Sequence, residues 1–197
     1  MLDVLIARHA QSVWNAQGRW QGQADPPLSE SGRAQARAAA RQCGGFDAIV
    51  ASDLERAADT ARILAETVGI GPVITDTAFR ERHAGEFQGL TRTEIDERFP
   101  GHLDNGRWPP GWEPDESVRS RVLEGMARVR EEVTVGQVLV VAHGGVIYSL
   151  EAHLGAPHER IPNLGGRWFH HLEDRWELGV RVQLSTDDVT VGNRDVL

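Results

Sequence analysis

The sequence predicts an α/β protein, built as a three-layer α/β/α sandwich around a mainly parallel sheet. Strand-like and helix-like segments alternate along the chain, which is the pattern of parallel strands joined by crossover helices. Residues 2–7 and 138–142 are apolar over nearly all of their length. We therefore expect both to be buried inner strands, because a strand covered on both faces is continuously apolar.

The other elements of the first half follow in order. After the first strand and a loop, a helix is predicted over residues 30–43, and a strand over residues 48–51. Ser52 to Glu55 has the S-x-x-E form of a capping box, so the next helix should begin at Ser52 and run to about Val68. Its apolar residues recur at steps of three and four, as a buried stripe requires: Leu54, Ala57, Ala61, Leu64, Ala65 and Val68.

The second half of the chain continues the alternation. A short strand is predicted near residues 73–75, and a helix over residues 116–133. The strand at 138–142 leads into another helix, and two further strands are predicted over residues 167–172 and 178–184.

Residues 79–114 are interpreted as an insertion within a single domain that spans residues 1–197. This segment has little periodicity and is rich in turn residues, including Pro109, Pro110 and Gly111, so we expect loops and one short helix near 91–98. Long loops in compact domains are commonly functional lids. The insertion is therefore predicted to form a cap over the strand ends.

The ends of the two inner strands carry the most informative side chains. Arg8 and His9 follow the first strand, and His143 follows the strand at 138–142. Strand ends at a switch point of an open α/β sheet face the ligand crevice. Arginine offers phosphate a planar fork of donors, and histidine can act as a covalent nucleophile. Taken alone, Arg8 and His9 are more typical of a surface arginine and a packed histidine, and the rest of the chain reverses that preference.

Two other segments supply partners for this chemistry. Arg56 lies in the first turn of its predicted helix, beside unpaired amide donors and the positive end of the helix dipole. The loop at 79–89 is dense in ionisable groups and contains a carboxylate suited to general acid work. Loop carboxylates are usually only solvated charges, so this loop decides nothing by itself.

Four blocks together resemble the histidine phosphatase superfamily, in its phosphoglycerate mutase-like group. They are R-H-A at residue 8, S-D-L-x-R-A-x-x-T-A at residue 52, E-R-H-x-G-x-x-Q-G at residue 81 and A-H-G-G at residue 142. The resemblance extends from Arg8 to Gly145, which is most of the chain. It implies the phosphoglycerate mutase-like form of the fold.

Matched residue by residue, the resemblance also implies roles. His9 is the implied phosphorylated nucleophile and Glu81 the implied proton donor, with Arg8, Arg56 and His143 around the phosphate. The other predicted substrate contacts are Ser12, Asn15, Gln21, Gly22, Gly144, Trp108 and Trp112. The first block departs from the family pattern, because Ala10 stands where glycine is usual and a methyl group must fit near the phosphate.

These residue types suit phosphoryl transfer without a metal or a cofactor. The transition state is loose and places charge on three oxygens, so catalysis is mainly positioning and electrostatic stabilisation. His9 must attack as a neutral imidazole, and nearby Arg8 and Arg56 disfavour its protonated form. The predicted activity is therefore that of a phosphomonoester phosphatase with a phosphohistidine intermediate, acting on a small phosphorylated metabolite.

Two alternatives stay open. A cofactor-dependent phosphoglycerate mutase would pass the phosphoryl group to a second hydroxyl in a closed site. The mutases that this chain resembles have a tyrosine at the position of Ala84, a lysine at that of Arg92 and an extended tail, whereas this chain ends at 195–197. Hydrolysis is therefore favoured. A non-catalytic phosphate-binding module is disfavoured, because His9, Glu81 and His143 occur together.

Composition limits the partners. The net charge of −8 disfavours nucleic acid, so a small-molecule phosphate ester is the expected partner. With a single cysteine, Cys43, and no apolar run long enough to span a membrane, the chain is expected to be cytoplasmic, without a membrane partner. A homodimer is left open. His83, His170 and His171 lack the spacing of metal ligands, so no metal is expected.

The tryptophans permit two interpretations. Trp108 and Trp112 in the cap, with Trp14 and Trp20 after the nucleophile, suit an apolar or sugar-stacking wall above the phosphate. Packing explains Trp108 and Trp112 equally well, and it is favoured for the remaining pair, Trp168 and Trp176. A late loop brings Asn163 into consideration as a further contact.

Overall fold

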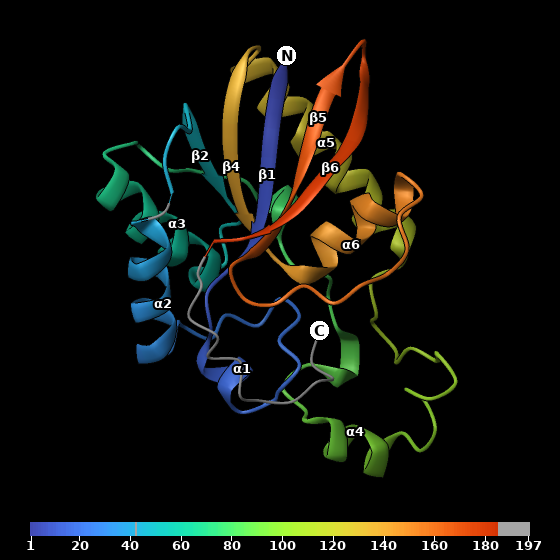
Figure 1. Cartoon of the computed structure of the whole chain (residues 1–197). Helices are drawn as coiled ribbons and strands as arrows, with labels where there is room; N and C mark the ends of the chain where they lie inside the picture. The colour runs from blue at the N-terminus through green and yellow to red at the C-terminus, as the bar shows by residue number, and fades with distance from the viewer. Residues whose placement is uncertain (42, 185–197) are drawn as a thin grey trace.

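The computed structural model describes residues 1–41 and 43–184. The described chain contains one six-stranded sheet with the order β3-β2-β4-β1-β5-β6 (Figure 1). The strands are β1 (Leu2–Arg8), β2 (Ala48–Ala51), β3 (Ile74–Thr75), β4 (Gly136–Ala142), β5 (Gly165–Leu172) and β6 (Arg175–Gln183). The helices are α1 (Val13–Ala16), α2 (Glu30–Ala40), α3 (Glu55–Val68), η1 (Thr77–Phe79), η2 (Gly85–Phe87), α4 (Arg92–Arg98), α5 (Asp115–Glu132) and α6 (Gly144–His153).

The predicted three-layer architecture is confirmed. Strands β1 to β4 pair in parallel, whereas β5 pairs antiparallel with β1 and β6 pairs antiparallel with β5. Successive residues of β1 point to opposite faces, with Val4 and Ile6 in one apolar cluster and Leu5 and Ala7 in the other. Helices α5 and α6 pack on the first face and α2 and α3 on the second.

The predicted start of α3 is wrong by three residues. The helix begins at Glu55, and its N-cap is Leu54, which makes no side-chain capping bond. Ser52 Oγ accepts the N–H of Leu54 at 3.3 Å, and Asp25 Oδ1 accepts the N–H of Glu55 at 2.7 Å. An aspartate 30 residues away thus satisfies the free amide at the helix start. Helix α2 also ends earlier than predicted, at Ala40.

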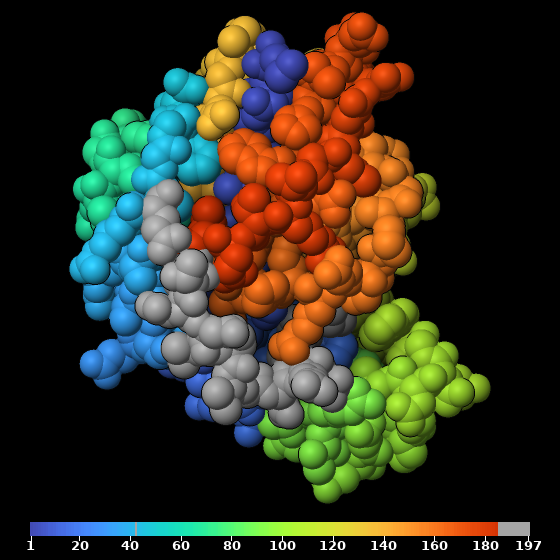
Figure 2. Space-filling model, in the orientation of Figure 1, coloured from blue at the N-terminus to red at the C-terminus, as the bar shows by residue number. Residues whose placement is uncertain are grey.

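Residues 79–114 lie beyond the carboxyl ends of the parallel strands, and Figure 2 shows the green part of this segment as a lobe below the sheet. The expected short helix is α4, whose capping box joins Thr91 and Glu94. Phe87, Leu90 and Ile95 of this segment form a small apolar cluster with Trp20, which lies in the loop after α1. Its interpretation as a cap on a single domain stays a prediction, and the chain end at 195–197 lies outside the described residues.

The structure also bears on membranes. Among the helices of residues 1–41 and 43–184, none is both long and apolar enough to cross a membrane.

Candidate active site

Two histidines meet where β1 and β4 end. These strands run in parallel with Arg8 opposite Ala142, so the residues that follow the two strands, His9 and His143, lie at the same edge of the sheet. The N–H of His9 donates to the carbonyl of Ala142 at 2.9 Å, which extends the pairing by one residue. The rings of His9 and His143 are 5.1 Å apart between centroids, at an interplanar angle of 61°. Both side chains are buried.

Arg56 enters the same site from the first turn of α3. Its side chain is fully buried, and its Nε donates to Nε2 of His9 at 3.2 Å. The two terminal nitrogens donate to the carbonyls of Ala24 at 2.8 Å and Gly22 at 2.9 Å. Gly22 has a φ of +51°, a backbone conformation that favours glycine. The guanidinium is therefore held by the loop that follows α1.

Arg8 supplies the second buried cation. Its NH1 donates to the carbonyl of Ile161 at 2.9 Å, which ties the end of β1 to the loop before β5. Burial lowers the pKa of Arg8, and it lowers the pKa of Arg56 to about 10. Arg56 therefore stays cationic near neutral pH, and Arg8 is taken as cationic because a guanidinium is not deprotonated in proteins.

The hydrogen bonds of His9 assign its tautomer. Its Nδ1 lies 2.6 Å from the carbonyl of Ala10, which can only accept, so Nδ1 carries the proton. Nε2 is then unprotonated, and its lone pair accepts from Nε of Arg56. Burial, followed by the charges of Arg56 and Arg8, holds the pKa of His9 well below its usual range. The ring is thus neutral, with Nε2 available as a nucleophile.

His143 is buried without a hydrogen-bond partner among the described residues for either ring nitrogen. Burial, followed by the charge of Arg56, also holds its pKa well below the usual range. A neutral imidazole carries one N–H donor, and an unpaired buried donor is costly. An anion bound between the two histidines would satisfy it.

Glu81 lies in the loop after η1 and is held by backbone donors. Its Oε2 accepts the N–H of Gly145 in the first turn of α6 at 3.2 Å, and its Oε1 accepts the N–H of Arg82 at 2.7 Å. A Cβ added to Gly145 would come within 2.2 Å of Oε1. Glycine at this position therefore makes room for the carboxylate.

Sequence reasoning missed the residue that holds this loop. Arg121 of α5 donates to the carbonyls of Ala78 at 2.8 Å, Arg80 at 2.6 Å and Glu81 at 3.2 Å. It also forms a bidentate ion pair with Glu113. The sequence offered one signal for this role, because Arg121 is next to Val122 on the apolar face of a predicted helix. A cation on a buried face needs several hydrogen-bond partners.

The structure places the other predicted contacts in two groups. The first supports the pocket from within the protein: Ser12 Oγ donates to Gln21 Oε1 at 2.6 Å and accepts the N–H of Asn15. Asn163 Nδ2 donates to the carbonyl of His9 at 2.8 Å and lies 3.3 Å from Asn15 Oδ1. Gly144, the first residue of α6, directly follows His143.

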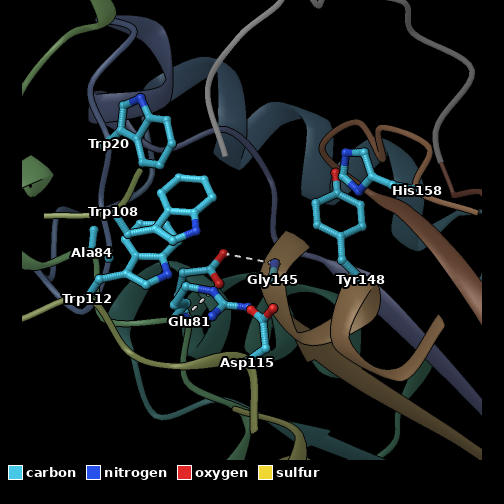
Figure 3. A pocket seen from close by; sticks show the side chains of 11 residues that line it. Trp20, Glu81, Ala84, Trp108, Trp112, Asp115, Gly145, Tyr148 and His158 are labelled. Carbon is cyan, nitrogen blue, oxygen red and sulfur yellow. Dashed lines mark hydrogen bonds and ion pairs between the residues drawn. The ribbon is translucent and has the colours of Figure 1, made fainter. Parts of the chain in front are cut away.

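The second group surrounds a cavity of about 320 Å³ next to Glu81. Its lining includes Gly22, Trp20, Trp108, Trp112, Ala84, Tyr148 and His158. Figure 3 shows the tryptophans on one side, Tyr148 and His158 on the other, and Glu81 with Gly145 between them. Three residues of the segment 79–114 and two residues from α6 and its following loop thus line the space beside the carboxylate.

Ala10 does not obstruct the phosphate site. Its side chain is buried in the same apolar cluster as Leu28 and Ala36. Its N–H donates to Thr60 Oγ1 at 3.1 Å. The methyl group that departs from the family pattern therefore packs in the core.

The extra histidines are dispersed. His170 and His171 are on β5, where His170 lies 2.7 Å from Asp3 and His171 packs on Trp176, while His83 lies in the loop between η1 and η2. Over residues 1–41 and 43–184, no group of three or more histidine, cysteine or carboxylate side chains is placed to hold a metal ion.

Comparisons with known proteins agree with this geometry. A model of the histidine phosphatase superfamily (branch 1) matches residues 4–177. A glucosyl-3-phosphoglycerate phosphatase of Mycolicibacterium vanbaalenii is 41% identical over 178 residues, or 83% of this chain and 79% of that protein. A 2,3-bisphosphoglycerate-dependent phosphoglycerate mutase of Gloeobacter violaceus is 37% identical over 166 residues, or 76% and 74%. The structure of a mycobacterial glucosyl-3-phosphoglycerate phosphatase with VO3 matches with a TM-score of 0.81 at 34% identity, over 90% of this chain and 97% of that one.

Proposed function

This chain belongs to the histidine phosphatase superfamily, and from that membership we propose that it hydrolyses small phosphomonoesters through a phosphohistidine at His9. The observation that carries the proposal is the unprotonated Nε2 of His9, which lies in a buried site with Arg8, Arg56 and His143. A neutral imidazole beside two cations is poised to attack an anionic phosphoryl group.

In the first step, a bond forms between Nε2 of His9 and phosphorus while the bond between phosphorus and the ester oxygen breaks. Protonated Glu81 gives its proton to the leaving oxygen, so that the alcohol departs neutral. In the second step, Glu81 takes a proton from water as the water attacks phosphorus. Inorganic phosphate leaves, and His9 and Glu81 return to their starting states.

The remaining groups bind the phosphoryl oxygens. Arg8 and Arg56 neutralise the charge that spreads over these oxygens, and His143 offers its unpaired N–H. The carboxamide oxygen of Asn15 accepts from Ser12 and Asn163, so its amino group is the donor that it offers to phosphate. Ser12 and Gln21 then act as positioning residues, because their side chains bond to each other.

Glucosyl-3-phosphoglycerate is the first substrate to test, because it is the ester named for relatives that match most of this chain. Hydrolysis is favoured over mutase transfer by the open cavity beside Glu81. Ala84 lines that cavity, and a larger side chain there would fill part of it. A cytoplasmic location, a homodimer and the absence of a nucleic-acid or membrane partner stay predictions.

The test is phosphate release and trapping of the intermediate. Wild-type protein should release inorganic phosphate and acquire an acid-labile label from a ³²P-labelled ester, and His9→Ala should do neither. Turnover by His9→Ala would refute the mechanism. With 3-phosphoglycerate and a catalytic amount of its bisphosphate, isomerisation that outpaced phosphate release would identify a mutase instead.

A further inference from the structure

The cavity beside Glu81 lies on the side of the site from which an alcohol would leave. Glu81 touches the cavity and must contact the ester oxygen in the proposed reaction, so the rest of the alcohol extends between the two aromatic walls (Figure 3). At about 30 Å³ for each water molecule, 320 Å³ holds on the order of ten waters. This space exceeds the needs of a three-carbon alcohol.

One wall is a rigid aromatic platform. Trp108 and Trp112 are stacked with centroids 4.2 Å apart and planes within 5°. Trp112 is also supported by Trp20 at 6.0 Å and Phe87 at 6.4 Å, and both of these side chains are buried. Trp108 at the outer end of the stack is 47% exposed. The stack therefore presents a flat, accessible aromatic surface at the cavity.

The opposite wall is fixed as well. The rings of Tyr148 and His158 meet edge to face at 4.5 Å, and the hydroxyl of Tyr148 accepts the N–H of Ile161 at 2.9 Å. At the edge of the cavity, Asp115 pairs with Arg82 at 2.7 Å and keeps its side chain 90% exposed. Aromatic faces with a polar rim can pack against the C–H face of a ring and hydrogen-bond to its hydroxyls.

We propose that Trp108 determines specificity by stacking on a sugar ring in the leaving alcohol. The preferred substrates are then phosphomonoesters whose alcohol carries a glycosyl group, with Asp115 placed to accept a sugar hydroxyl. This inference rests on the proposed phosphatase function. It goes further, because it assigns to one side chain the preference for a glycosylated over an unglycosylated ester.

A matched pair of substrates isolates the ring. Glucosyl-3-phosphoglycerate and 3-phosphoglycerate share the same reacting phosphate and differ by the glucosyl group, so their ratio of kcat/KM reports on the ring alone. The wild type should favour the glucosyl ester. Trp108→Ala should reduce this preference by about 2- to 12-fold, mainly through KM, which is the size of an aromatic stacking interaction.

Three controls make the result specific. Trp108→Phe, which keeps a flat ring, should retain more of the preference than Trp108→Leu, which keeps only apolar bulk. Trp176→Phe removes a tryptophan from β6, where Trp176 packs on His171, and should leave the ratio unchanged. A naphthyl phosphate tests for an aryl ring in place of the sugar.

The outcomes separate this inference from the function on which it rests. Equal loss on both phosphoglycerates, or no loss on either, would overturn the role of Trp108. A greater loss on naphthyl phosphate than on the glucosyl ester would overturn the assignment to sugars. Failure of the wild type to release phosphate from any ester, including a nitrophenyl ester, would overturn the phosphatase function and this inference with it.

Discussion

Replacing Arg56 by methionine should cost the enzyme most of its activity while leaving it folded. Methionine keeps much of the apolar volume on α3 but removes the cation and three hydrogen bonds, to His9, Gly22 and Ala24. Loss of one preorganised electrostatic donor costs about 2.7–4 kcal/mol, or about 10²- to 10³-fold in rate. We therefore expect kcat/KM to fall by that factor.

The same change should alter the pH profile. Positive charge on Arg56 is the second cause, after burial, of the lowered pKa of His9. Without that charge the pKa of His9 rises, although burial still keeps it below the usual value. Because His9 must be neutral to attack, kcat/KM falls below this pKa, and the acidic limb should move to higher pH in the variant. Ionisation of the substrate affects both proteins equally, so it does not contribute to the difference between their pH profiles.

The assay is phosphate release from a nitrophenyl ester between pH 4.5 and 8, together with thermal unfolding to verify folding. Arg62→Met is the matched control, because Arg62 lies on the same helix but faces solvent and pairs with Asp59. Exposed ion pairs contribute about 0–1 kcal/mol, so this control should keep its activity. A loss below tenfold for Arg56→Met, or an acidic limb that stays in place, would refute the electrostatic role.

Three further predictions concern other parts of the site. Glu81→Gln should slow hydrolysis of an alkyl phosphate far more than that of a nitrophenyl ester, whose leaving group scarcely needs a proton, and equal losses would remove Glu81 from the acid role. Glu151→Gln should weaken the buried ion pair with Arg181, and Arg181 donates to the carbonyl of Glu159 at 2.8 Å in the loop that anchors Arg8. We therefore expect kcat to fall, but by less than in Arg56→Met. An unchanged kcat would show that the loop keeps its position without this ion pair. Both site histidines are neutral in the folded protein because their pKa values are lowered, so below about pH 6.5 the unfolded chain binds protons that the folded chain does not. The free energy of unfolding should therefore decrease as the pH is lowered, by up to about 1.4 kcal/mol per pH unit for each histidine. In urea unfolding, His143→Asn should show a smaller decrease per pH unit than the wild type.

The sequence by itself predicted the layers of the fold and the edge of the sheet at which Arg8, His9 and His143 lie. The sequence shows continuous apolar runs in β1 and β4, and apolar residues spaced three and four apart in α3. These local patterns indicate which faces of each element are buried. Parallel strands end at one edge of the sheet, so Arg8, His9 and His143 could be placed together before their contacts were known.

Only the tertiary structure decided how these residues are held. Helix α3 begins at Glu55 because Asp25, 30 residues earlier, accepts its N–H, and no pattern around Ser52 contains that contact. The hydrogen bond from Arg56 to Nε2 of His9 and the packing of the Ala10 methyl group likewise depend on residues that are distant in the sequence. Arg121 secures the loop of Glu81 from 40 residues away. Local periodicity specifies burial, whereas hydrogen bonds between distant segments depend on how the elements pack.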